Sequence, residues 1–150
     1  MKLAEALSIR KDLQKRIDQT ESRLCRNATV QEGDQPTEDP TELFAELDSC
    51  LQQLQTLIYR INATNMNVVC NGKTLTQMMA EREVLIRKIT ALRNVTEQAS
   101  RQQERYSRSE IKQVITVDVR ALNKQVDALS QQLRKLDIEI QQLNFSEELR

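Results

Sequence analysis

The sequence predicts an all-α protein, built as an antiparallel four-helix bundle that forms a single domain over residues 1–150. The chain has only two Gly and two Pro, which is too little turn-forming chemistry for a protein made of many β-hairpins. Its last long stretch also repeats apolar residues at alternating spacings of three and four, which is typical of a helix that buries one stripe. These residues are Val119, Leu122, Val126, Leu129, Leu133, Leu136, Ile140 and Leu143.

The first predicted helix runs over about residues 2–26, and its apolar stripe is the weakest of the four because Arg10 interrupts it. The segment 27–39 then breaks the helical period with Gly33, Pro36 and several acidic residues, so we expect a surface loop. The inner stripe of this helix consists of Leu3, Ala6, Leu13, Ile17, Thr20 and Leu24.

The second predicted helix has a clear beginning. Asp39 can cap the first free amides, Pro40 suits the first helical position, and Glu42 stands where a capping box places an acid. A second apolar row beside the main stripe indicates a wide buried face that contacts two neighbours or more. The main stripe is Leu43, Leu47, Cys50, Leu54, Leu57 and Ile61, and the second row is Phe44, Leu51 and Ile58.

A small hairpin-like loop is predicted at residues 66–75, because Asn71-Gly72 is a strong two-residue turn signal between short apolar runs. Thr74 and Gln77 form a capping-box pattern that begins the third helix. The inward positions of this helix are Leu75, Met78, Arg82, Leu85, Ile89 and Leu92.

A short extended segment is predicted at residues 111–117, where β-branched residues lack helical spacing. The fourth helix follows from Val119, and the last residues, NFSEELR, are expected to form a turn. Ile138 and Phe145 lie seven residues apart on the outward side of this helix, so they are a candidate oligomer contact.

An alternative architecture is a pair of coiled-coil hairpins that complete their core only in a homo-oligomer. The positions beside the last stripe are uncharged and do not oppose such pairing. These positions are Asn123, Gln125, Ser130 and Gln132.

The composition also bounds location and partners. Lys plus Arg equals Asp plus Glu at 22 each, so no overall field attracts nucleic acid or an anionic membrane. Glu5 and Arg10 interrupt any apolar core of a signal peptide, and no apolar run approaches the roughly 20 residues of a transmembrane helix. Three widely spaced cysteines fit reduced thiols. We therefore expect a cytoplasmic protein.

One candidate polar cluster follows from the bundle topology. If the helices alternate in direction, the acidic loop and the basic segment after the third helix lie at the same end of the bundle. They are expected either to form surface ion pairs or to hold a small ligand or metal ion. The candidate residues are Glu32, Asp34, Arg105, Tyr106 and Arg108.

No catalytic, cofactor or metal residues are predicted. The chain has no His, the commonest general base and metal ligand. Gly72-Lys73-Thr74 lacks the earlier Gly of a phosphate-binding loop, since position 67 is Asn. The acidic loop also lacks the spacing of a calcium-binding EF-hand.

Several phrases of the sequence resemble a small bacterial helical family labelled septicolysin. They are MKLAEALSIRKDLQKRI, VQEGDQPTEDP, RINATN, NGKTLTQMMAER and RYSRSEIKQVITVDVRAL, and the resemblance extends over nearly the whole chain. Phe145 stands where this family is expected to have Trp. The resemblance implies a cytolytic, pore-forming protein and supplies no catalytic residues.

The residues themselves favour a different function. Four apolar stripes, a balanced charge and the outward pair on the last helix indicate a non-enzymatic protein that acts through self-association or protein contacts. A membrane-active cytolysin and a ligand- or metal-binding protein are the alternatives.

Overall fold

The computed structural model describes residues 1–104 and 113–150. Over these residues the chain forms four α-helices and one two-stranded hairpin, which confirms the all-α class. The predicted extended segment at 111–117 is described from residue 113, and residues 113–118 are a non-helical connection. The elements are α1 (Leu3–Asn27), α2 (Pro40–Asn67), β1 (Val69–Cys70), β2 (Lys73–Thr74), α3 (Leu75–Glu104) and α4 (Val119–Ser146).

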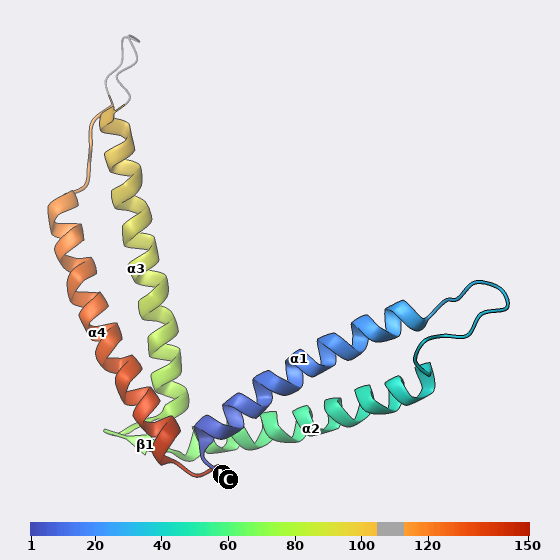
Figure 1. The fold of residues 1–150 in the computed structure, drawn as a ribbon. Helices are drawn as coiled ribbons and strands as arrows, with labels where there is room; N and C mark the ends of the chain where they lie inside the picture. The colour runs from blue at the N-terminus through green and yellow to red at the C-terminus, as the bar shows by residue number, and fades with distance from the viewer. Residues whose placement is uncertain (105–112) are drawn as a thin grey trace. The chain divides into compact units, whose positions relative to one another are not determined.

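The chain divides into two compact units. Unit 1 comprises Met1–Thr74 and Leu143–Arg150, so it contains α1, α2 and the last turn of α4. Unit 2 comprises Leu75–Gln142, which is α3 with most of α4. Within each unit the two long helices lie side by side and run in opposite directions (Figure 1). The single domain expected over residues 1–150 stays a prediction.

Unit 1 buries the predicted inner stripes of α1 and α2 against each other. Thr20 takes part in this stripe and is almost fully buried although it is polar. Phe44 and Leu51 of the second apolar row are exposed, so the expected wide buried face of α2 is wrong for both of them. The buried residues are Leu3, Ala6, Leu13, Thr20 and Leu24 of α1 with Leu43, Cys50, Leu57, Ile61, Thr64 and Asn65 of α2.

The beginning of α2 and the hairpin that follows it form as the sequence predicts. The Asp39 carboxylate accepts a hydrogen bond from the Thr41 amide at 2.8 Å, and Pro40 takes the first helical position. β1 and β2 are antiparallel, and the turn between them is Asn71-Gly72, with φ of 52° and 78°. Positive φ at both turn positions matches the twist of a two-residue hairpin, which explains the Asn-Gly pair.

A contact between the chain's two end segments closes one end of unit 1. Leu3 N donates to Glu147 O and Leu149 N donates to Met1 O, each at 2.9 Å. Arg150 N donates to the Thr64 hydroxyl at 3.0 Å, which ties the same segment to α2. We call residues 1–3 and 147–150 with these bonds the terminal clasp. Its Leu149 side chain is buried, so the expected final turn is part of the core.

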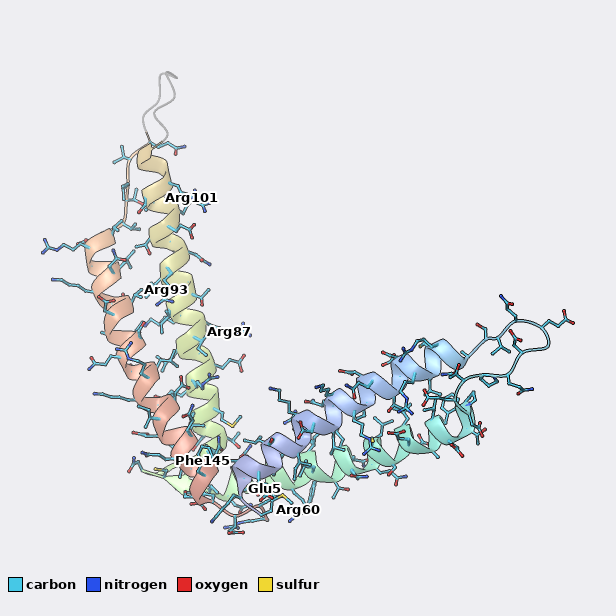
Figure 2. The ribbon with its side chains drawn as sticks, viewed as in Figure 1. Glu5, Arg60, Arg87, Arg93, Arg101 and Phe145 are labelled. Atoms are coloured by element: carbon cyan, nitrogen blue, oxygen red, sulfur yellow. The ribbon has the colours of Figure 1, made fainter. Side chains whose placement is uncertain are left out.

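The terminal clasp also carries charged contacts. Lys2 Nζ lies 3.0 Å from Glu148 Oε1 and donates to Ser146 O at 2.8 Å. Arg60 Nε donates to Arg150 O at 2.8 Å. Figure 2 shows Arg60 of α2 and Glu5 of α1 at this same end of the helix pair.

Unit 2 contains α3 and most of α4, and both helices contribute buried residues to it. Arg82, expected on the inward stripe of α3, has an exposed side chain that forms an ion pair with Asp137 of α4. The Asp118 carboxylate accepts from Ala121 N at 3.0 Å and so caps the start of α4. Buried residues in this unit include Leu75, Met78, Leu85, Ile89 and Thr96 from α3 and Val126, Leu136 and Ile140 from α4.

Candidate functional site

The strongest candidate for a functional surface lies on α2, on the side away from its buried stripe. Large apolar side chains stand exposed there: Phe44 by 57%, Leu51 by 44%, Tyr59 by 74% and Met66 by 60%. Such residues on a helix surface gain free energy when a partner removes them from water. They share one face with Asp48, Gln55 and Asn62, which are also exposed. We call these seven residues the α2 outer face.

Helix geometry places the α2 outer face on a single stripe. At about 100° of rotation per residue, its seven positions fall within an arc of about 80°. Asp48 is the one charged residue among them, although 29% of the chain is charged. The other three charged residues of this helix lie outside this face, for example Glu46 on the side facing α1 and Arg60 at the terminal clasp.

Ile138 and Phe145, the predicted oligomer contact, are exposed as expected, by 55% and 71%. Figure 2 shows Phe145 on the last part of α4. Their outward placement is therefore confirmed. Their role in self-association stays a prediction.

The predicted polar cluster falls partly outside the described residues. Arg105, Tyr106 and Arg108 lie there, so their relation to the acidic loop stays a prediction. Glu32 and Asp34 are described, and both are exposed in the loop after α1. The Asp34 amide donates to Gln31 O at 2.9 Å, which forms a turn with Gly33 at a φ of 91°.

The acidic loop does take part in an ion-pair network, but through Glu38. The Glu38 carboxylate accepts two hydrogen bonds from Arg23 Nε of α1, both at 3.1 Å, and a further contact from Arg23 Nη2. Glu46 of α2 accepts from Arg16 Nε at 2.9 Å and from Arg23 Nη1 at 3.3 Å. Asn27 accepts from Glu38 N at 3.1 Å. The network joins α1, the loop and α2.

These hydrogen bonds shift the pKa values of the groups that they join. Hydrogen bonds from Arg23 hold the pKa of Glu38 below its ordinary value, and hydrogen bonds from Arg16 do the same for the pKa of Glu46. The pKa of the Arg23 guanidinium is raised because it donates to Glu38. Both guanidinium groups are thus already paired with carboxylates, which favours a structural role in joining the two helices.

Sequence reasoning missed this network, although one signal was present. Arg16 and Arg23 are seven residues apart, so they lie on the same side of α1. An open groove runs along that side of the helix, and its lining includes Lys15, Arg16, Thr20, Arg23 and Arg26 with Glu46. The hydroxyl oxygen of Thr20 is buried without a hydrogen-bond partner.

Two further features of the structure bear on the alternative functions. Among the side chains of residues 1–101 and 113–150, no three from His, Cys, Asp or Glu gather closely enough to hold a metal ion. None of the helices, over the part of the chain that the structure describes, is long and apolar enough to cross a membrane.

The comparisons with known proteins correct the resemblance to septicolysins. Residues 10–149 match the model of a family described as "Family of unknown function (DUF6847)". A solved structure, described as that of a functionally unknown conserved protein from Corynebacterium diphtheriae, is similar over 100% of this chain and 99% of its own. Its sequence identity is 40% and its TM-score 0.93.

Neither finding carries a septicolysin label, so the expected membership of that family is wrong. No curated protein matches the chain. Shared short phrases in helical, Gln- and Leu-rich sequence identify a family less specifically than a match over 140 residues. The chain belongs to the family of unknown function DUF6847.

Proposed function

We propose that this protein is a non-enzymatic helical protein that acts through protein contacts, and that self-association is one of them. The observation that carries the proposal is the α2 outer face, where Phe44, Leu51, Tyr59 and Met66 are exposed on one stripe. Covering this stripe would remove apolar surface from water without burying more than one charge per chain.

The balance of residues on this face supports a protein partner. Aromatic residues and Met are enriched at protein interfaces, and charged residues are depleted from the centres of interfaces. The exposed Ile138 and Phe145 of α4 offer additional apolar surface. The cytoplasmic location expected from the sequence stays a prediction.

The mass of the purified protein in solution tests the proposal. We expect light scattering at tens of micromolar to give a mass above the 17.4 kDa of one chain. The double substitution Leu51→Glu and Tyr59→Glu places charges in the centre of the α2 outer face. We expect it to reduce the mass to that of one chain while helicity by circular dichroism is unchanged.

A matched control is Val84→Glu, which changes an exposed apolar residue of α3 in unit 2. This variant should keep the mass of the wild-type protein. A wild-type protein that stays monomeric across this range would contradict the proposal, and so would a control that dissociates as fully as the double variant.

A further inference from the structure

The α2 outer face has the same spacing when it is followed from either end. Its positions are separated by 4, 3, 4, 4, 3 and 4 residues, and Gln55 is at the centre. Each residue therefore has a counterpart at the same distance on the other side of Gln55. The residues are Phe44, Asp48, Leu51, Gln55, Tyr59, Asn62 and Met66.

Such symmetry lets two antiparallel copies of the face oppose each other residue by residue. In a two-fold symmetric interface the same patch is used on both copies, so the patch must be complementary to itself. Two α2 helices packed in opposite directions about Gln55 would pair Phe44 of one copy with Met66 of the other. The same arrangement would pair Leu51 with Tyr59.

The chemistry of the opposed side chains agrees with their positions. The Met66 thioether is a favourable neighbour for the Phe44 ring, and Leu51 supplies an aliphatic surface for Tyr59. The remaining positions pair polar groups with each other. The Asn62 amide can donate to the Asp48 carboxylate, and the two Gln55 amides can donate to and accept from each other at the axis.

A parallel pairing of the same face is worse. It would place Asp48 directly against Asp48 of the second copy, and like charges at close range oppose association. In the antiparallel pairing the two Asp48 residues are separated by the length of the central part of the helix. They are 14 residues apart in register, or about 21 Å along the axis.

From this pattern we infer that the α2 outer face is the interface of a homodimer in which two α2 helices pack antiparallel about a two-fold axis at Gln55. The inference rests on the proposed self-association and names its partner as a second copy of this chain. Four large side chains per copy, at roughly 100–200 Å² each, supply on the order of 1,000 Å² in total, near the lower bound for a specific interface. The dimer should therefore be weak, with micromolar affinity.

Disulfide cross-linking tests the register. The background variant carries Cys25→Ser and Cys70→Ser, because Cys50 is buried and the other two cysteines are more accessible. In this background Gln55→Cys places two thiols at the axis, so mild oxidation should give a cross-linked dimer that reductant reverses. Gln53→Cys, exposed on another side of α2, is the matched control and should stay largely uncross-linked.

A mixture of two variants, each with one introduced cysteine in the same background, tests a second pair of positions. Leu51→Cys and Tyr59→Cys, combined in equal amounts, should cross-link to each other more than either does to itself. Cross-linking that is equal at Gln53→Cys and Gln55→Cys would show random collision and overturn the inference.

A charge substitution tests the direction of the helices without oxidation. In Asn62→Lys, the antiparallel pairing places a new ammonium opposite Asp48 twice in each dimer. We expect roughly two- to tenfold tighter dimerisation, which high salt removes. A parallel pairing would instead oppose the two new lysines and weaken the dimer. Sedimentation at several protein concentrations measures this change.

The outcomes separate this inference from the proposed function. A dimer by light scattering that neither cross-links at Gln55→Cys nor tightens in Asn62→Lys overturns the antiparallel register and leaves self-association standing. A wild-type chain that is monomeric at every concentration overturns both.

Discussion

Unit 1 and unit 2 are each built from two long antiparallel helices, yet the buried stripe of α4 in unit 2 is more open than the clasped end of unit 1. In unit 1, Leu3, Ile61 and Thr64 are at most 1% exposed, and all belong to the end that the terminal clasp covers. In α4, Leu136 and Ile140 are buried but remain 8% and 9% exposed. Two helices alone leave the edges of their buried stripe exposed to water. In unit 1 the terminal clasp is a third segment that covers one end of the stripe.

The largest expected difference concerns the core side chains. Ile61→Ala should reduce the free energy of unfolding by about 3–5 kcal/mol, because a fully enclosed side chain leaves a cavity that cannot collapse. Leu136→Ala, at a more open site, should cost about 2–3 kcal/mol. Urea unfolding followed by circular dichroism measures both. Equal losses of unfolding free energy would mean that the terminal clasp does not make the core around Ile61 more deeply buried.

The same experiment tests the expected single domain. If residues 1–150 unfold as one unit, both variants should shift a single transition. Separate transitions, with Ile61→Ala moving one and Leu136→Ala moving the other, would show that the two units unfold independently.

The next effect concerns two buried threonines. The Thr64 hydroxyl donates to Arg60 O and accepts from Arg150 N, whereas the Thr96 hydroxyl donates only to carbonyls of its own helix. Thr64→Val should cost about 1–2 kcal/mol because it leaves the Arg150 amide without its partner. Thr96→Val should be nearly neutral. The difference between the two losses of unfolding free energy gives the contribution of the hydrogen bond from the Arg150 amide to Thr64.

Ion pairs between helices should contribute less. Arg82 and Asp137 form one such pair in unit 2, and both side chains are more than a third exposed. Asp137→Asn should therefore cost about 0.5 kcal/mol. Glu46→Gln in unit 1 disrupts contacts to both Arg16 and Arg23 and should cost more than Asp137→Asn. Thermal unfolding of the two variants, at low and at high salt, ranks the pairs.

The smallest effect is a dependence on pH that belongs to unit 1. The pKa values of Glu38, Glu46 and Glu148 are lowered, in each case mainly by hydrogen bonds from basic side chains. Their stabilisation is present above the ordinary carboxyl pKa of 4.5 and is lost as pH falls through the lower folded values. Protection of the unit 1 amides against hydrogen exchange, measured relative to the intrinsic exchange rate at each pH, should therefore fall below about pH 4.5.

Two arginine variants check the origin of this acid sensitivity. Arg23→Met removes the partner that lowers the pKa of Glu38, so its stability should fall less steeply with acid than that of the wild-type protein. Arg87→Met is the control, because Arg87 pairs with Glu83 within one exposed helix turn. An unchanged slope in Arg23→Met would exclude the network as the cause.

Local patterns in the sequence predicted most of the fold. Asp39 and Pro40 mark the start of α2 because capping and a fixed φ depend only on neighbouring residues. Asn71-Gly72 predicts the hairpin because few other residues adopt positive φ at low cost. The eight-residue stripe predicts α4, and each of its positions is buried or half-buried in the structure.

Other features could not be predicted because they join residues far apart in the chain. Glu148 is 146 residues from Lys2, and no periodicity connects the two positions. The second apolar row of α2 has the period of a buried face, but Phe44 and Leu51 are exposed. An apolar stripe indicates that burial would be favourable; it does not say whether the burying partner belongs to the same chain.

The sequence by itself determined the helices, the capped start of α2, the hairpin and the stripes, because each depends on backbone preferences and on spacing within a few turns. Only the tertiary structure decided which stripe is covered, how deeply, and by what. Arg23 pairs with Glu38 and Glu46, and Arg150 pairs with Thr64, because packing brings these groups together after the helices have formed. The same packing leaves the α2 outer face exposed, and the proposed self-association is argued from that exposure.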